Sequence, residues 1–422
     1  GLPVTAHDFE YSWKRVLNPA TASQYAYILY FIKGAEEYNT GKVKDPAMVG
    51  VKALGDFKLQ VQLTHPTPFF PHLVSYYTYR PVPKKTVERH GDKWTHPEHI
   101  VSNGAYRIVS WIPQKEILMG KNPHYWEADN VKIPKAKFLP VEDRETALKL
   151  HLNGKVHYSE DLPYLKIPEL KKRGDYQDGP AFITYYYQFN TRRKPFDDVR
   201  VRRALNRAID KKRITEFMKK GDFPVTHLTP SGMKGYTPPE GDSFDPVQAK
   251  KLLAEAGFTD PATFPAVSIY YNTSENHKTI AELIQHMWKE NLGISVGLIN
   301  QEWKVVTQTY QSGNYDIGRM AWIGDYLDPY TFLTLLTSGS QQNETGWGNS
   351  VYDDLVLNQS AVESNPKKRE KLLQTAEKLL LDETVIIPLY QYNLPILVDP
   401  RLKGFYNNPL KHHPLKFASF EE

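Results

Sequence analysis

The chain has 422 residues, 40% of them hydrophobic and 24% charged, a composition typical of a globular protein with two or three domains. Its 53 basic and 48 acidic residues give a net charge of only +5, and the basic residues are scattered, which argues against nucleic-acid binding. The absence of cysteine excludes disulfides, thiolate metal ligands and thiol nucleophiles. No apolar run approaches the roughly 20 residues that a membrane-spanning helix needs.

The N-terminal part predicts one helix followed by strands. Thr5, with Asp8 three positions later, forms the pattern of a helix N-terminus. Residues 57–64 alternate apolar and polar side chains, which predicts a half-buried strand that pairs with residues 51–54 in a hairpin. A second strand-rich region is expected from about residue 103 to residue 139. The first third of the chain is therefore predicted to be β-rich.

From about residue 184 onward, helices alternate with strands. Asp245, Pro246 and Gly257 are typical of the cap, first turn and end of one helix. Apolar spacing predicts further helices and strands, which we expect as a buried strand at 184–190, a helix from about 199 to 208, a helix at 278–291 followed by a strand at 294–298, and a helix at 366–381 followed by a strand at 385–389. This alternation predicts an α/β domain with a mixed or parallel sheet.

Residues 319–325 read Arg-Met-Ala-Trp-Ile-Gly-Asp and combine a cation, an indole and a carboxylate. Such a segment suits a zwitterionic ligand, whose ammonium group would seek Asp325 and whose carboxylate would seek Arg319. The alternative interpretation is the end of a strand that carries one ion pair. The local sequence leaves both open.

Several common catalytic patterns are missing from the sequence. There is no glycine-rich phosphate loop, no Gly-x-Ser-x-Gly elbow and no His-x-x-x-His pattern, so we expect no cofactor and no metal. The chain contains 27 tyrosines and many carboxylates, for example Glu302, Asp325 and Asp328. An aromatic cleft with two carboxylates would fit a carbohydrate-active enzyme, which we keep as an alternative of another class.

Six segments of the chain stand out: Pro-Val-Thr-Ala-His-Asp-Phe-Glu-Tyr-Ser-Trp at 3–13, Asn-Gly-Ala-Tyr at 103–106, Asn-Pro-His-Tyr-Trp at 122–126, Pro-Phe-Asp-Asp-Val-Arg at 195–200, Ala-Lys-Lys-Leu-Leu-Ala-Glu-Ala-Gly at 249–257 and Tyr-Asn-Thr-Ser at 271–274. In this order they resemble segments of the periplasmic oligopeptide-binding proteins that serve bacterial ABC peptide importers, the extracellular solute-binding proteins of family 5. The resemblance covers essentially the whole chain.

This resemblance implies an α/β protein of the three-lobed periplasmic binding type, with mixed sheets and a hinge between lobes. We expect a β-rich lobe at 1–84, a composite lobe at 85–182 plus 393–422, and an α/β lobe at 183–392. The chain begins well inside the family pattern, so an N-terminal strand and an export signal are expected to be missing from it.

The implied function is that of a receptor, and not an enzyme, in the periplasm of a Gram-negative bacterium. The receptor would be a monomer that captures short peptides and delivers them to an ABC permease in the membrane, with no nucleic-acid partner. A narrower ligand, such as a dipeptide or a murein tripeptide, is the alternative within the same class.

The resemblance also assigns roles to residues of the cleft. Asp325 matches the aspartate that pairs with the peptide's ammonium group, and Arg319 and His277 match positions that receive its carboxylate. Two departures bear on ligand choice, since Tyr310 replaces a second arginine and Gln188 replaces a glutamate of close relatives. The remaining positions expected to line the cleft are Tyr25, Trp303, Ala321, Trp322, Ile323, Tyr390 and Tyr392.

Overall fold

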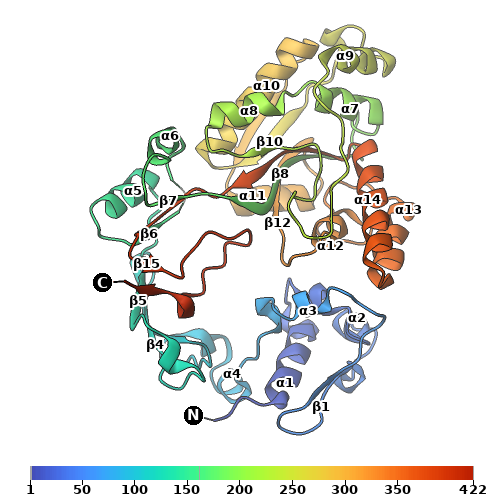
Figure 1. The fold of residues 1–422 in the computed structure, drawn as a ribbon. Helices are drawn as coiled ribbons and strands as arrows, with labels where there is room; N and C mark the ends of the chain where they lie inside the picture. Colours follow the sequence, from blue (N-terminus) through green and yellow to red (C-terminus); the bar gives the residue numbers. More distant parts are fainter. Residues whose placement is uncertain (1, 161, 422) are drawn as a thin grey trace. The chain divides into compact units, whose positions relative to one another are not determined.

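The computed structural model describes residues 2–160 and 162–421 and separates the chain into two compact units. One unit comprises Gly1–Pro163, Glu169–Gln177 and Pro395–Glu422, and the other comprises Tyr164–Pro168 and Asp178–Leu394 (Figure 1). Within the described residues, no helix has both the length and the apolar character that a membrane crossing requires.

The first unit combines short helices with small antiparallel sheets. Its helices are α1 (Ala6–Leu17), α2 (Ala35–Asn39), α3 (Phe70–Leu73), α4 (Lys84–His90) and α5 (Arg144–Leu152). Its sheets are β1 (Val51–Ala53) with β2 (Leu59–Val61), then β3 (Tyr106–Ile112), β4 (Glu116–Lys121) and β5 (Lys135–Phe138), then β6 (Tyr158–Ser159), β14 (Ile396–Val398) and β7 (Tyr176–Gln177), and finally β15 (Leu402–Lys403) with β16 (Ser419–Phe420). The short helix α6 (Ile167–Leu170) lies in the sequence where the two units alternate.

The local predictions for this unit are confirmed in part. Residues 2–84 were expected to be β-rich, but they form helices α1, α2 and α3, and their strands β1 and β2 have three residues each. Helix α1 begins after Thr5, whose backbone N–H donates to the Asp8 carboxylate at 2.8 Å. Strands β1 and β2 form the predicted antiparallel hairpin, although β2 covers only Leu59–Val61 of the predicted range 57–64, and β3 to β5 occupy the predicted strand-rich region. The further division of this unit into two lobes at residue 84 stays a prediction.

The second unit is built on a mixed six-stranded sheet. In spatial order its strands are β11 (Gly297–Gln301), β10 (Ser268–Asn272), β12 (Ile317–Ile323), β8 (Pro180–Phe189), β13 (Ile386–Asn393) and β9 (Phe223–Pro224). Strand β10 runs parallel to both β11 and β12, whereas β8 runs antiparallel to β12 and β13. The predicted mixed α/β sheet is therefore confirmed.

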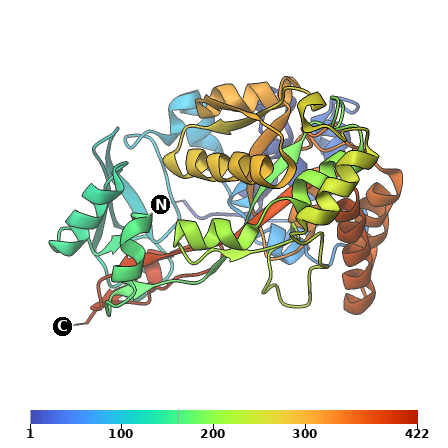
Figure 2. The same ribbon diagram turned by 90° about the horizontal axis from the view of Figure 1, so that it is seen from above.

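Helices cover this sheet through their apolar faces. Tyr185, Tyr187 and Ile269 from the strands pack in one core cluster with helices α7 (Val199–Arg207), α8 (Lys211–Met218), α9 (Pro246–Glu255) and α10 (Glu275–Leu292). Figure 2 shows α9 and α10 lying beside one another. A second cluster joins Tyr310 of α11 (Trp303–Gln311) to Met320 of β12.

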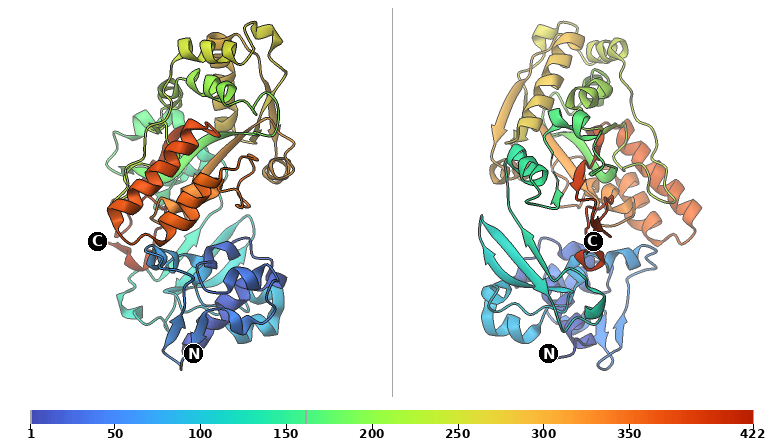
Figure 3. Two further views of the ribbon diagram at one scale, coloured as in Figure 1. Left: turned by 90° about the vertical axis from the view of Figure 1, so that its right-hand side faces the viewer. Right: turned by 60° about the vertical axis from the view of Figure 1, so that its left-hand side comes forward.

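The remaining helices lie near the C-terminal end of this unit. They are α12 (Tyr330–Leu333), α13 (Ser350–Asp353) and α14 (Pro366–Asp382), with a π-helical segment, Asp354–Ser360, after α13. Helix α14 packs against that segment (Figure 3). The predicted helices of the second unit are all confirmed, including the Asp245 cap, whose carboxylate accepts from the Gln248 N–H at 2.9 Å.

One predicted strand is misplaced by three residues. The apolar run at 294–298 predicts a strand there, but β11 is Gly297–Gln301. Ile294 and Val296 are buried in the core as part of the connection from α10, before the strand begins. Strand β11 lies at the edge of the sheet, where polar residues such as Asn300 are tolerated, so hydrophobicity does not mark its true extent.

The ends of the longer segment of this unit are held together. Asn393 Nδ2 donates to the Asp178 carboxylate at 3.2 Å, and the Leu394 N–H donates to the Gly179 carbonyl at 2.9 Å. The chain therefore enters this segment at residue 178 and leaves it at residue 394 at neighbouring points. The predicted lobe boundaries at 183 and 392 fall close to these positions, and the three-lobe division itself stays a prediction.

Candidate functional site

The candidate site is organised by strand β12 and its neighbour β8. The antiparallel register pairs Arg319 with Tyr187, Ala321 with Tyr185 and Ile323 with residue 183. Directly paired residues share a face of a sheet, so Arg319, Ala321 and Ile323 project to the same side as Tyr185. Ala321 packs against the core cluster on this face, whereas the Ile323 side chain is exposed.

The guanidinium group of Arg319 is enclosed by neutral partners. Only 8% of Arg319 is exposed. Its Nη1 donates to Asn272 Oδ1 at 3.2 Å, its Nη2 donates to the Tyr392 hydroxyl at 3.3 Å, and its Cζ lies 4.5 Å from the centroid of the Tyr185 ring. Its Nε is buried without a hydrogen-bond partner. In the described part of the chain, no carboxylate lies within ion-pair distance of this guanidinium.

The electrostatics keep this arginine charged. Burial lowers the pKa of the Arg319 guanidinium, electrostatic interactions with Tyr185, Tyr392 and Tyr390 raise it, and the pKa lies above the ordinary arginine value. Burial raises the pKa of the Tyr185 hydroxyl, so this tyrosine stays neutral. A buried cation without an anionic partner is costly in a folded protein, and an incoming carboxylate would compensate for it.

His277 and Tyr390 belong to the same cluster. Nδ1 of His277 lies 3.2 Å from the Tyr185 hydroxyl, and the histidine is half-buried in the first turn of α10. The rings of Tyr185 and Tyr390 stack at a centroid distance of 4.8 Å, and Tyr390 lies 5.3 Å from Tyr392. Strands β8, β10, β12 and β13 and helix α10 therefore bring together five predicted residues: Arg319, His277, Ala321, Tyr390 and Tyr392.

Asp325 lies in the turn that follows β12. It is half-buried, and its N–H donates to the Thr331 hydroxyl at 3.2 Å. The preceding Gly324 donates its N–H to the Phe182 carbonyl at 2.9 Å. A β-carbon on Gly324 would lie 2.9 Å from the Phe332 ring, so only glycine fits this close approach. The turn thus fixes the backbone of Asp325 just beyond the end of the strand that carries Arg319.

The two predicted tryptophans occupy different settings. Trp322 follows Ala321 on β12 and points to the opposite face, where its Nε1 is buried without a partner. Trp303 is the first residue of α11 and is 51% exposed. An exposed indole is available for contact with a ligand.

Gln188 and Tyr310 are buried by other protein groups. Gln188 Nε2 donates to the Glu344 carboxylate at 3.2 Å. The Tyr310 hydroxyl donates to the carbonyls of Tyr270 and Arg319, at 2.8 and 3.2 Å. Burial raises the pKa of Glu344 to about 7. The influence of Gln188 and Tyr310 on ligand choice stays a prediction.

Tyr25 belongs to the first unit. Its ring lies 5.7 Å from that of Tyr27 and 5.6 Å from that of Tyr76, in a small aromatic group. Its predicted contact with a ligand stays a prediction.

Three residues of the cluster were missed by sequence reasoning. Tyr185 was recognised only as part of a buried strand, and Asn272 only as part of a family-like segment. Lys220 places its Nζ 5.0 Å from the centroid of the Tyr392 ring and 3.8 Å from the Asp222 carboxylate. The run of aromatic residues along 184–190 could have drawn attention to Tyr185, but no local signal marks Lys220.

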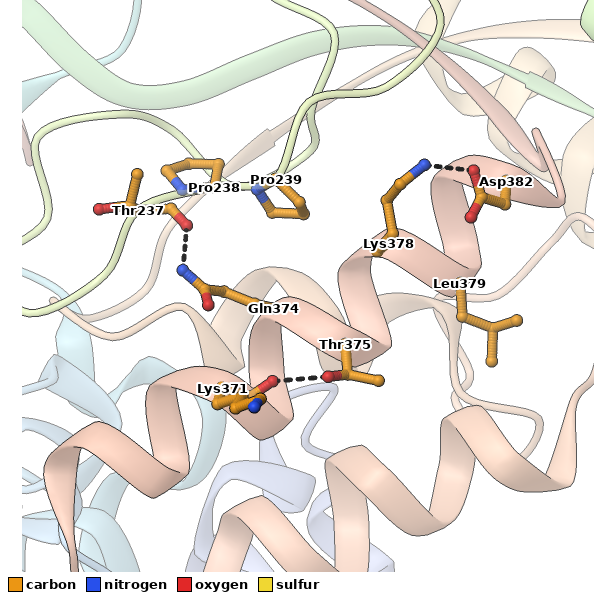
Figure 4. A pocket seen from close by; sticks show the side chains of 9 residues that line it. All are labelled: Thr237, Pro238, Pro239, Lys371, Gln374, Thr375, Lys378, Leu379 and Asp382. Atoms are coloured by element: carbon orange, nitrogen blue, oxygen red, sulfur yellow. Dashed lines mark hydrogen bonds and ion pairs between the residues drawn. The ribbon is translucent and has the colours of Figure 1, made fainter.

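A separate groove of about 610 Å³ lies on the surface of the second unit. Figure 4 shows the loop with Pro238 and Pro239 on one side and α14 on the other, with Lys378 paired to Asp382. None of the predicted site residues lines it. No group of three or more histidine, aspartate or glutamate side chains in the described residues is arranged to hold a metal ion.

Comparison with known proteins identifies relatives along the whole chain. The oligopeptide-binding protein OppA of Bacillus subtilis is 39% identical over 421 residues, which cover 96% of this chain and 76% of that protein. The structure of the Escherichia coli murein tripeptide binding protein MppA matches with a TM-score of 0.89 and 37% identity, covering 99% of this chain and 84% of that one. Haemophilus influenzae OppA in complex with the peptide RPPGFSPFR matches with a TM-score of 0.87 and 34% identity, covering 100% and 84%.

These structural matches confirm the predicted fold class, the α/β fold of the peptide-binding periplasmic proteins. Residues 1–344 also match the model of the bacterial extracellular solute-binding proteins, family 5 Middle. The chain therefore belongs to family 5 of the bacterial extracellular solute-binding proteins.

Proposed function

We propose that the protein is a receptor that captures short peptides with free termini and delivers them to an ABC permease in the membrane. The observation that carries this proposal is the buried Arg319 guanidinium, which has hydrogen-bond partners but, among residues 2–160 and 162–421, no carboxylate beside it. A carboxylate of a ligand would supply the missing negative charge and accept a hydrogen bond from the unpaired Nε. Asp325, beyond the other end of the same strand, would receive the ammonium group.

The length of strand β12 supports a short peptide. From Arg319 to Ile323, the last residue of the strand before the turn that carries Asp325, the backbone makes four steps, which is about 13 Å at the usual rise. An extended peptide covers about 3.3–3.6 Å per residue, so three or four residues match this length. The printed names of the relatives, an oligopeptide-binding protein and a murein tripeptide binding protein, agree with a ligand of this class.

The protein would work without catalysis, as a monomer, in the periplasm of a Gram-negative bacterium. Membership of an extracellular solute-binding family supports a role in ligand capture and a location outside the cytoplasm. The nonapeptide bound by a relative indicates that longer peptides are accepted within the family. A carbohydrate-active enzyme, the alternative of another class, would be revived by turnover of a glycan that a carboxylate substitution abolishes.

Titration calorimetry with Ala-Ala-Ala tests the proposal. Removal of one partner of a buried, hydrogen-bonded ion pair costs about 3–5 kcal/mol, so Asp325→Asn should weaken binding by roughly 10²- to 10³-fold. N-acetylation of the peptide should have a similar effect, because it removes the ammonium group. The matched control is Asp382→Asn on the surface of α14, which should leave the affinity unchanged. Equal affinity for the free and acetylated peptides would rule the proposal out.

A narrower ligand within the same class is favoured by one comparison, the similarity to the murein tripeptide binding protein. Native mass spectrometry of the purified protein separates the two candidates. A ladder of co-purified masses that correspond to short peptides would support a broad receptor. A single recurring mass would identify a dedicated ligand.

A further inference from the structure

The turn that carries Asp325 is connected to α14 by a buried ion pair. Arg369 Nη1 and Nη2 donate to the two carboxylate oxygens of Asp328, at 2.7 and 2.8 Å. Both side chains are only 11% exposed. Bidentate pairing of this kind fixes orientation as well as distance, because the planar guanidinium matches both oxygens.

A further hydrogen bond, to a third element, holds the Arg369 side chain in place. Its Nε donates to the carbonyl of Ser360, at the end of the π-helical segment, at 3.0 Å. The side chain therefore connects three elements: α14, the segment Asp354–Ser360, and the turn after β12. A lysine has neither an Nε donor nor a two-pronged end group, and so cannot reproduce these three contacts.

Three further hydrogen bonds in the turn connect Asp328 to Asp325. Asp328 Oδ1 accepts the Tyr330 N–H at 2.9 Å, and the Asp328 carbonyl accepts the Thr331 N–H at 3.3 Å. The hydroxyl of Thr331 in turn accepts the N–H of Asp325. The position of the Asp325 backbone is thus set by Thr331, which the Asp328 carbonyl holds directly and which follows Tyr330, the residue whose N–H the Asp328 carboxylate holds.

We propose that Arg369 is a positioning residue, which acts through Asp328 to hold the Asp325 carboxylate where it receives the ammonium group of a peptide. This inference rests on the proposed function of Asp325. It adds that recognition of the peptide's amino terminus depends on a residue of α14. A charged group of the ligand is sensitive to small displacements of its partner, because a charge-assisted hydrogen bond weakens steeply with angle and distance.

The test compares two peptides on two variants of the full chain. Dissociation constants for Ala-Ala-Ala and for N-acetyl-Ala-Ala-Ala are measured by calorimetry for the unmodified protein, for Arg369→Lys and for Arg203→Lys. Arg203 is a matched control, because it forms a bidentate pair with Asp242 in the same unit, at 2.9 and 3.1 Å, and takes no part in the turn. Thermal unfolding of each variant reports the loss of stability separately.

We expect Arg369→Lys to weaken binding of the free peptide by about tenfold or more, which is about 1.4 kcal/mol, and to leave the acetylated peptide within about threefold. Arg203→Lys should change neither constant. An unchanged ratio of the two constants in Arg369→Lys would overturn the positioning role, since a purely structural effect lowers both affinities alike. If Arg369→Lys does not fold, Asp328→Asn, which keeps an oxygen for the Tyr330 N–H, takes its place in the same comparison.

The same measurements distinguish this proposal from the function on which it rests. If the unmodified protein binds the free and acetylated peptides equally, ammonium recognition by Asp325 fails, and the role of Arg369 fails with it. If the unmodified protein prefers the free peptide and Arg369→Lys keeps that preference, only the role of Arg369 is overturned.

Discussion

The Tyr392 hydroxyl lies 3.3 Å from Arg319 Nη2, so residues of β13 and β12 meet across β8, the strand that separates them in the sheet. Tyr185, on β8 itself, places its ring beneath the same guanidinium. Three adjacent strands, with Asn272 at the end of a fourth, thereby define the position of one cation. This arrangement makes the contribution of Arg319 testable through the ligand's carboxylate.

Arg319→Met should abolish the distinction between a free and an amidated peptide C-terminus. The unmodified protein should prefer Ala-Ala-Ala over its C-terminal amide by about 10- to 100-fold, since charge-assisted hydrogen bonds contribute about 1.5–3 kcal/mol. In Arg319→Met both peptides should bind with the same, weaker affinity, as measured by calorimetry. Arg213→Met, which removes an exposed arginine on α8, is the control. Retention of the preference in Arg319→Met would contradict the role of this arginine.

Tyr185 is expected to act through its ring rather than its hydroxyl. Tyr185→Phe keeps the aromatic face below the guanidinium and removes the hydroxyl, with its contact to His277 and its electrostatic interaction with Arg319, and we expect a change in peptide affinity below about threefold. Tyr185→Leu removes the cation–π contact and should weaken binding by about 5- to 30-fold. Calorimetry measures the peptide affinity of both variants. A larger loss of affinity in Tyr185→Phe than in Tyr185→Leu would show that the hydroxyl contributes more than the ring.

Gly318 is expected to be required by the packing of Tyr310. A β-carbon at residue 318 would lie 2.9 and 3.0 Å from Cε1 and Cζ of the Tyr310 ring. Gly318→Ala should therefore lower the free energy of unfolding by about 1–3 kcal/mol, measured by urea denaturation. Gly339→Ala is the control, because nothing lies within 4 Å of a β-carbon there.

A second substitution tests the cause of that destabilisation. In the Tyr310→Leu background the ring is gone, so adding Gly318→Ala should cost much less than it does alone. Equal costs in both backgrounds would show that the backbone of β12, and not the tyrosine ring, is responsible.

Lys211 is expected to destabilise the protein in a pH-dependent way. Burial lowers the pKa of its ammonium group to about 7, although Asp242 and Glu240 raise it in part, and its Nζ has no hydrogen-bond partner among the described residues. Between about pH 7 and pH 10.5 the unfolded chain binds the proton that the folded chain has lost, so stability rises with pH across this window. Below about pH 7 the ammonium group is protonated in both states, so the folded protein bears the full cost of burying its charge.

Replacement of Lys211 by methionine should remove this penalty. We expect Lys211→Met to raise the free energy of unfolding by about 2–4 kcal/mol at pH 6 and by much less at pH 10, measured by denaturant titration at both values. Lys212→Met, at a neighbouring exposed lysine, should leave the pH dependence unchanged. An identical slope in Lys211→Met and the unmodified protein would refute the assignment.

The parts of the fold that could be predicted from the sequence are those determined by local interactions. The Asp245 cap and the apolar stripe of α10 each involve residues a few positions apart, and both were predicted correctly. The start of β11 was not, because its burial depends on its place at the sheet edge. The same distinction applies to the candidate site. Arg319 and Asp325 were recognisable as neighbours, whereas only strand order brings Tyr185 and Asn272 to the guanidinium.

The hydrogen bonds between Asn393 and Asp178 and between Leu394 and Gly179 have a consequence for how such a protein can be rebuilt. A segment whose two ends are neighbours can be inserted into a host loop at little entropic cost, since the host chain only has to bridge a short gap. Arg319, Asp325 and their surrounding tyrosines all lie inside that segment, between residues 178 and 394. Recombination at these two points would therefore transfer the two charges that we propose to bind the peptide termini as one module, with its supporting hydrogen bonds intact.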